Sequence, residues 1–164
     1  MHEARIAALQ GMPIFGGLRS DVLASLLEVS TTVEVPKDAY FFHEGDKAES
    51  VFVLEQGEVA ILKRWAGQQF LLGRLRQGDC FGEMALLDLF PRSASVRAVE
   101  ACTALALSTA SFLKLYETDV EQFAIVQMNI ARELSRRLRE ADERLFRAHV
   151  GALRPEPEYS LLVI

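Results

Sequence analysis

The feature that most constrains this chain is a series of short apolar segments between Thr31 and Leu107, separated by turn residues. The segments are rich in β-branched and aromatic residues and read TTVEV, AYFF, VFVL, EVAILKRW, QFLLGRL, ASVRAV and TALALS. Three of the turns between them carry a glycine followed by an acid: Gly45-Asp46, Gly57-Glu58 and Gly78-Asp79. Glycine readily adopts the positive φ that tight turns need. Many short strands at this spacing predict an antiparallel β-roll (a double-stranded β-helix or jelly roll) over about residues 31–107.

Helical patterns lie on both sides of the strands. Before them, apolar residues from Val22 to Leu27 recur at helical spacing. After them, Thr118-Asp119-Val120-Glu121 fits a capping box, in which Thr118 would cap a long helix over about residues 118–150. The sequence therefore predicts an α+β fold that is mainly β, with N-terminal helices and a long C-terminal helix. We expect one domain over residues 1–151 and a C-terminal tail over residues 152–164.

The long predicted helix carries an apolar seam. Its apolar members are Phe123, Ile130, Leu134, Leu138, Ala141 and Leu145, and Gln127 fills one further position, so that the spacing mostly alternates between four and three. This pattern is typical of coiled coils. The helix either packs along its own β-roll or pairs with a second chain, and we favour a symmetric homodimer. Its arginines alternate with glutamates and aspartates, which indicates a solvated face and not a surface for nucleic acid.

The stretch from Phe81 to Ala98, FGEMALLDLFPRSASVRA, has the residues of a compact anion site. A glycine at position 82 lets the backbone approach a ligand, and Met84 to Asp88 would form one helical turn with free N–H groups. The guanidinium of Arg92 suits phosphate oxygens, Ser93 adds a hydroxyl, and the carboxylate of Glu83 suits sugar hydroxyls. From spacing alone, an Arg92–Glu83 ion pair that merely closes a turn is an equally good interpretation.

The same stretch resembles the phosphate-binding cassette of the cyclic nucleotide-binding domain family. That family includes bacterial catabolite activator proteins, the regulatory subunits of cyclic-AMP-dependent kinase and cyclic-nucleotide-gated channels. The shared pattern is F-G-E-x-A-L-L, a short loop, and then P-R-S/T/A-A-x-V-x-A, and this chain matches nearly all of it. The looser resemblance runs from about Ile14 to Leu145.

The resemblance implies a role for each matching position. Glu83 and the backbone of Gly82 would hold the ribose 2′-hydroxyl, and Arg92 would bind the cyclic phosphate with the Ala85 amide and Ser93. The full set of ligand-binding residues expected is Phe81, Gly82, Glu83, Met84, Ala85, Arg92, Ser93 and Ala94.

The family caps the base with the long C-terminal helix, often from a partner subunit. Candidate lid residues here are Arg137, Leu138, Ala141 and Arg144. Catabolite activators carry a Thr-Ser pair for adenine where this chain has Ala141-Asp142, which leaves recognition of adenine in doubt. By the resemblance to relatives that respond to cyclic GMP, the hydroxyl of Ser93 is suited to contact a guanine, so the expected ligand is either cyclic AMP or cyclic GMP.

Several other classes of protein are not expected. The net charge of −5 argues against a nucleic-acid binder, and the residues after Gly151 are too few for a DNA-binding winged helix-turn-helix. The sequence has no run of eighteen apolar residues, so no membrane span is predicted. The three histidines, His2, His43 and His149, are too scattered to predict a metal site. The sequence shows no arrangement of a nucleophile with a base, so an enzyme is not predicted. No cofactor is expected beyond the nucleotide ligand.

The function that the sequence favours is a stand-alone cytoplasmic cyclic nucleotide sensor that acts through protein–protein contacts with an unidentified effector protein. Cys80 and Cys102 are interpreted as reduced, buried thiols. Two alternatives remain: a nucleotide-independent scaffold or dimerisation module with a relic site, or a binder of cyclic di-GMP. The apolar tail, RPEPEYSLLVI, either docks on a partner or folds back on its own domain.

Overall fold

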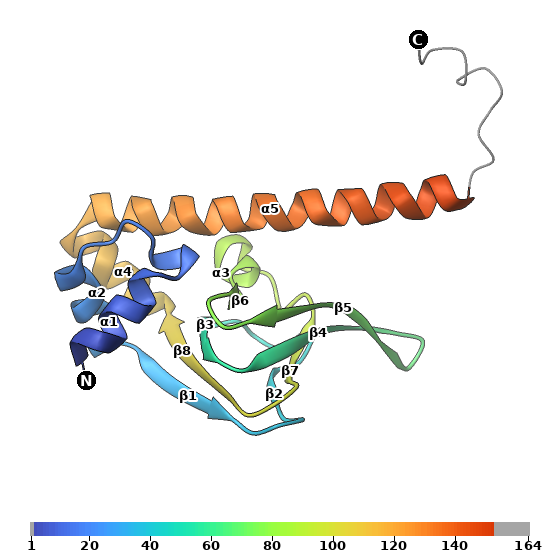
Figure 1. The fold of residues 1–164 in the computed structure, drawn as a ribbon, viewed down its shortest axis with the longest axis horizontal. Helices are drawn as coiled ribbons and strands as arrows, with labels where there is room; N and C mark the ends of the chain where they lie inside the picture. Colours follow the sequence, from blue (N-terminus) through green and yellow to red (C-terminus); the bar gives the residue numbers. More distant parts are fainter. Residues whose placement is uncertain (1, 153–164) are drawn as a thin grey trace, which may run out of the picture. The chain divides into compact units, whose positions relative to one another are not determined.

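The structure is a computed structural model that describes the backbone of residues 2–152 and all of their side chains except those of residues 2, 85, 86, 151 and 152 (Figure 1). The predicted tail, and with it the question of its docking, lies outside the described residues apart from residue 152. The chain forms two compact units, one that ends at Ile130 and one that begins at Ala131. The expected single domain over residues 1–151 stays a prediction.

Two four-stranded antiparallel sheets confirm the predicted β-roll. The first has the order β1-β8-β3-β6, with β1 Thr31–Val35, β3 Ser50–Gln56, β6 Cys80–Phe81 and β8 Cys102–Ser108. The second has the order β2-β7-β4-β5, with β2 Tyr40–Phe42, β4 Glu58–Trp65, β5 Gln68–Arg76 and β7 Ser95–Ala98. Neighbours in each sheet are mostly not consecutive along the chain, so each sheet depends on contacts between distant segments.

Residues of both sheets meet in one hydrophobic core. Its buried members are Val35, Leu54, Val59, Phe81, Val96, Ala98, Cys102 and Ala104. The rings of Phe41, Phe52 and Phe81 lie within 5.0–5.4 Å of one another, which fixes β2 against β3 and β6. Cys80 and Cys102 are buried and form no disulfide within residues 2–152.

Helices precede and follow the strands. Before them lie α1 His2–Gln10, the 3-10 turn η1 Pro13–Phe15 and α2 Ser20–Glu28. The short α3 Met84–Asp88 interrupts the strands, and α4 Thr109–Thr118 and the long α5 Val120–Ala152 follow them. The amide of Asn129 donates to the carbonyls of Ile14 (3.1 Å) and Gly16 (2.8 Å), so the start of α5 is tied to the N-terminal segment. Within residues 2–152, no helix is long and apolar enough to cross a membrane.

The predicted capping box at Thr118 is wrong. Thr118 ends α4, and its hydroxyl donates to the carbonyl of Lys114 at 2.8 Å within that helix. Asp119 caps α5 instead, because its Oδ1 accepts the backbone N–H of Gln122 at 3.1 Å. Asp119 has an extended φ of −154° and separates α4 from α5. The cap of the long helix therefore lies one residue after Thr118, the position that the sequence pattern predicted.

Candidate functional site

The cassette predicted from Phe81 to Ala98 connects the two sheets. It leaves the first sheet at β6, passes through α3 and an exposed loop, and enters the second sheet at β7. Leu89 ends α3 in the left-handed region with φ 60°, and the carboxylate of Asp88 accepts the backbone N–H of Phe90 at 3.0 Å. Because both ends are anchored in strands, the loop between them is held close to the β-roll.

Arg92 is buried and its guanidinium is fixed on two sides. Its side chain donates to the carbonyl of Gly82 through Nη1 at 2.9 Å and to the carbonyl of Ser50 through Nη2 at 2.8 Å. The Cζ atom lies 4.0 Å from the centre of the Phe42 ring, in cation–π geometry. Its Nε is buried and finds no hydrogen-bond partner among the described residues. The arginine thus donates to carbonyls and does not form the simple ion pair with Glu83 that was the alternative interpretation.

Position 82 requires a glycine, both for its backbone conformation and for the space beside Arg92. Its φ is +81°, a conformation that costs other residues about 1–2 kcal/mol. A Cβ at this position would lie 2.5 Å from Nη1 of Arg92 and 3.4 Å from the Phe42 ring. The glycine therefore permits the close approach between the start of the cassette and its arginine.

The turn at Gly45 and Asp46, which follows β2, holds the backbone of Arg92. The N–H of Gly45 donates to the carbonyl of Arg92, and the N–H of Arg92 donates to the carbonyl of Asp46, both at 2.9 Å. The sequence marked this segment only as a Gly-acid turn. Its role in holding the arginine, like those of Ser50 and Phe42, was missed, and no sequence signal links these distant residues to the cassette.

The charges around Arg92 act in opposite directions. Burial lowers the pKa of Arg92, while the nearby carboxylates of Asp46 and Glu83 raise it. An arginine keeps its charge in proteins, so this is a buried cation. Glu83 is itself buried, with 3% of its surface exposed. A bound anion would offset part of the cost of burying the guanidinium.

The remaining predicted residues lie in different environments. Met84 and Ser93 are exposed, with the Ser93 hydroxyl 4.0 Å from the Met84 sulfur, and Ala85 lies in α3. Phe81 and Ala94 are buried, and the Phe81 ring belongs to the core. The candidate lid residues all lie on α5 within the second unit, and they are Arg137, Leu138, Ala141 and Arg144. The ligand-binding roles of all these residues stay predictions.

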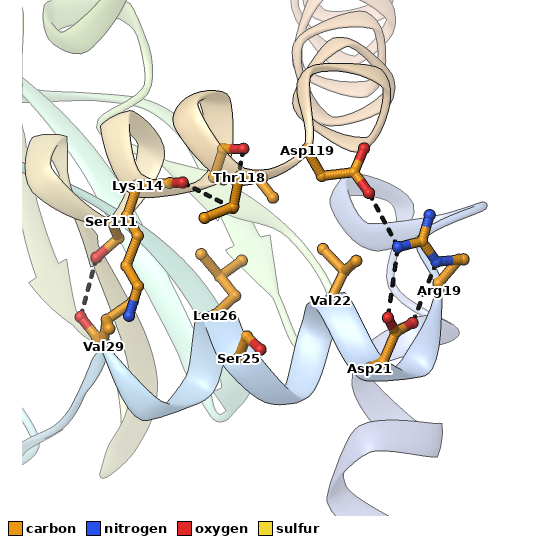
Figure 2. Close-up of a pocket in the computed structure, with 11 residues that line it drawn as sticks. Arg19, Asp21, Val22, Ser25, Leu26, Val29, Ser111, Lys114, Thr118 and Asp119 are labelled. Atoms are coloured by element: carbon orange, nitrogen blue, oxygen red, sulfur yellow. Dashed lines mark hydrogen bonds and ion pairs between the residues drawn. The ribbon is translucent and has the colours of Figure 1, made fainter.

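A separate pocket of about 290 Å³ lies between α2 and α4 (Figure 2). Val22, Leu26 and Leu115 give it apolar walls. At one end Arg19 is paired with Asp21 (3.2 Å) and Asp119 (2.9 Å), and toward the other end Ser111 donates to the carbonyl of Val29. None of its lining residues belongs to the cassette. The pocket marks the place where the N-terminal helices contact the α4–α5 junction.

The fold and cassette together define a β-roll domain built around one buried arginine. Residues 32–119 match the family model described as Cyclic nucleotide-binding domain, and the chain belongs to that family. The family resemblance predicted from the cassette is therefore confirmed.

Two curated relatives and one solved structure illustrate the similarity. The chain is 34% identical over 155 residues to the "Cyclic AMP receptor protein" of Thermus thermophilus, covering 94% of this chain and 70% of that protein. It is 35% identical over 92 residues to the "cAMP-dependent protein kinase regulatory subunit" of Emericella nidulans, covering 56% of this chain and 22% of that one. The crystal structure of Thermus thermophilus catabolite activator protein superposes with a TM-score of 0.72 at 34% identity, covering 84% of this chain and 63% of that chain. This chain thus spans only part of each of these proteins.

Proposed function

We propose that this chain is a non-enzymatic cyclic nucleotide sensor whose ligand places its phosphate at Arg92. The observation that carries the proposal is the buried guanidinium, which two carbonyls and an aromatic ring hold in one orientation. A fixed, planar set of donors suits the oxygens of a single phosphodiester. The printed names of the two curated relatives refer to cyclic AMP, which makes cyclic AMP the first ligand to test.

The other cassette residues take supporting roles in this proposal. The buried carboxylate of Glu83 would accept a hydrogen bond from the ribose 2′-hydroxyl, with the Gly82 backbone beside it. The Ala85 amide and the Ser93 hydroxyl would complete the phosphate contacts. Phe81, Met84 and Ala94 would shape the site, and Arg137, Leu138, Ala141 and Arg144 would cover the base.

We propose that the signal leaves the β-roll through α4. This helix follows β8 directly, its first turn is capped by Ser108, and its end meets the N-terminal helices at Asp119. A ligand shifts such a helix only if it binds one helix position more tightly than the other. The output would be a contact with an effector protein, made by a homodimer that pairs through α5. Cys80 and Cys102 are buried and not joined in a disulfide, which fits the reducing cytoplasm, where we expect the protein to act.

The test is calorimetric titration of protein stripped of nucleotide by unfolding and refolding. Cyclic AMP, cyclic GMP and cyclic di-GMP are titrated in parallel, and circular dichroism checks that the protein has refolded. Saturable binding, micromolar or tighter, of one of them supports the sensor and identifies its signal. If the folded protein binds none of the three nucleotides, the result supports the alternative, a scaffold with a relic site.

Hydrogen–deuterium exchange tests the proposed route. Ligand addition should change exchange in residues 109–130, which hold α4 and the start of α5. Unchanged exchange there, with binding established by calorimetry, would contradict the route through α4 while leaving the sensor itself intact.

A further inference from the structure

The pocket between α2 and α4 has an apolar wall on each side. Val22 and Leu26 line it from α2, and Leu115 lines it from α4. Val29, which follows α2, lies at one end and is 36% exposed. The volume of about 290 Å³ is at the lower end for a small-molecule site. All of its lining residues belong to the first compact unit, so one folded unit forms the whole pocket.

One end of this pocket carries a positive charge that no protein group offsets. The hydroxyls at this side are satisfied, because Ser111 donates to the carbonyl of Val29 at 2.9 Å and Thr118 to the carbonyl of Lys114 at 2.8 Å. Among the side chains that the structure describes, the ammonium of Lys114 has no hydrogen-bond or ion-pair partner. Figure 2 shows this side chain running from α4 toward Val29 at the end of α2. An ammonium only donates, so this end suits an anionic acceptor.

The opposite end of the pocket carries an excess of negative charge. Arg19 pairs there with Asp21 at 3.2 Å and with Asp119 at 2.9 Å. One guanidinium and two carboxylates leave a net charge of −1 at this end. A second anion would be repelled there. A complementary ligand therefore has one anionic end, which lies toward Lys114, and an uncharged body along the apolar walls.

We propose that this pocket, which we call the α2–α4 pocket, binds a small monocarboxylate with an apolar chain. The carboxylate pairs with the ammonium of Lys114, and the chain lies between the apolar walls of α2 and α4. From Val22 to Val29 the backbone rises by about 10 Å at the usual helical spacing, and extended octanoate has about this length. No residue of the pocket belongs to the nucleotide cassette, so this site does not depend on the proposed nucleotide ligand.

Nuclear magnetic resonance tests the proposal by titration of the isotope-labelled full chain with octanoate. Backbone amide signals of residues 19–29 and 111–119 should shift and saturate, with a Kd of about a millimolar or tighter. Octylamine has the same chain with the opposite charge, and it should bind about tenfold more weakly or worse. Suberate carries a carboxylate at both ends, and it should also bind more weakly because the second one would lie beside Asp21 and Asp119.

Variants of Lys114 test the charge. Lys114→Glu should weaken octanoate binding by about tenfold, because it replaces an exposed attraction with a repulsion. Lys114→Arg keeps the positive charge and should keep most of the affinity. Lys37→Glu is the matched control, since Lys37 is an exposed lysine in the turn between β1 and β2, and it should change nothing. Circular dichroism checks that each variant is folded.

Two further variants test the location. Ser25 lines the pocket from α2 and is exposed, so the ring of Ser25→Phe would occupy the pocket without entering the core. The saturable shifts should be lost in this variant. Arg92→Ala should leave octanoate binding unchanged, which separates this site from the proposed nucleotide site. Failure of octanoate to bind would in turn leave the calorimetric test of the nucleotide unaffected.

Three results would overturn the proposal. The first is a titration in which the signals of α2 and α4 do not shift and saturate. The second is full affinity in Lys114→Glu, or equal affinity for octylamine, because either result would rule out recognition of a carboxylate. The third is binding that persists in Ser25→Phe, which would show that octanoate adsorbs to apolar surface elsewhere on the protein.

Discussion

Nη1 of Arg92 donates to the carbonyl of Gly82 at 2.9 Å, and a Cβ on that same glycine would lie 2.5 Å from the same nitrogen. The residue that accepts from the arginine is thus the residue whose lack of a side chain makes room for it. The two positions are ten residues apart and are separated by α3, so this contact closes the segment of the cassette that contains α3.

Gly82→Ala should damage ligand binding more than stability. The new methyl group meets the end of a side chain, so Arg92 must move, and affinity for the nucleotide should fall by about tenfold or more. The positive φ adds a stability cost of about 1–2 kcal/mol. Calorimetric titration and urea unfolding measure the two effects.

Gly57→Ala is the matched control. Its φ is +99°, and its Cβ would meet the Ala101 carbonyl at 2.8 Å and the Cys102 sulfur at 2.7 Å, neither of which can easily move. Stability should fall by about 2–4 kcal/mol, while the folded fraction keeps its affinity. Equal affinity in Gly82→Ala and wild type would show that the arginine's position does not matter for the ligand.

Arg92→Ala should weaken nucleotide binding by about thirtyfold or more, because loss of a buried charge-assisted contact costs about 2–5 kcal/mol. Arg92→Lys keeps the charge but loses the planar fork, and it should lie between Arg92→Ala and wild type. Thermal unfolding provides a second readout, since ligand at about a hundred times its Kd stabilises the folded state by about 2.7 kcal/mol. A ligand-induced rise in Tm that persists in Arg92→Ala would place the phosphate elsewhere.

Asp119 should make folding stability depend on acid pH. The N–H of Gln122, and secondarily the guanidinium of Arg19, lower the pKa of Asp119 in the folded state. Its contribution is therefore present above the pKa of an unfolded aspartate, about 3.9, and is lost as pH falls through the lower folded value. Urea unfolding at neutral and acid pH should show a smaller loss of stability in Asp119→Ala than in wild type.

Asp119→Asn separates the cap from the ion pair. Asparagine is as good an N-cap as aspartate but carries no charge. At neutral pH its stability should lie between Asp119→Ala and wild type, and it too should lack the acid titration. An unchanged acid response in both variants would assign that response to other carboxylates.

A charge in the α5 seam should prevent dimer formation. Leu138 and Leu145 are 62% and 59% exposed, as expected for residues that a second chain would cover. Leu138→Glu should raise the dimer dissociation constant by about a hundredfold or more, because the dimer would bury an unpaired charge. Light scattering coupled to size exclusion measures the mass. At 3.6 residues per turn Glu143 lies on the opposite side of the helix, so Glu143→Lys is the control. A wild-type mass of one chain at all concentrations would contradict the homodimer.

The class of fold and the identity of the cassette could both be predicted from the sequence. Alternating short strands predict a β-roll because each strand must bury one face, and this requirement is local to each segment. The cassette was recognisable because its glycine, glutamate and arginine lie within one short stretch from Phe81 to Ala98. Gly82, Arg92 and the short helix between them could be predicted from their residue types because the site is contiguous in the chain.

The surroundings of those residues depend on the tertiary structure. Ser50, Phe42 and the Gly45–Asp46 turn hold Arg92 from distant segments of the chain, and hydrogen bonds between distant backbone groups leave no pattern in a sequence. The cap of α5 also depends on the tertiary structure. By residue type alone, Thr118 and Asp119 are both good N-caps. Asp119 became the cap because of the turn between α4 and α5 and its 2.9 Å contact with Arg19, 100 positions earlier in the chain. The sequence determines which side chains can cap a helix or bind an anion. Which of several chemically equivalent residues does so depends on which of them the folded backbone brings within hydrogen-bonding distance.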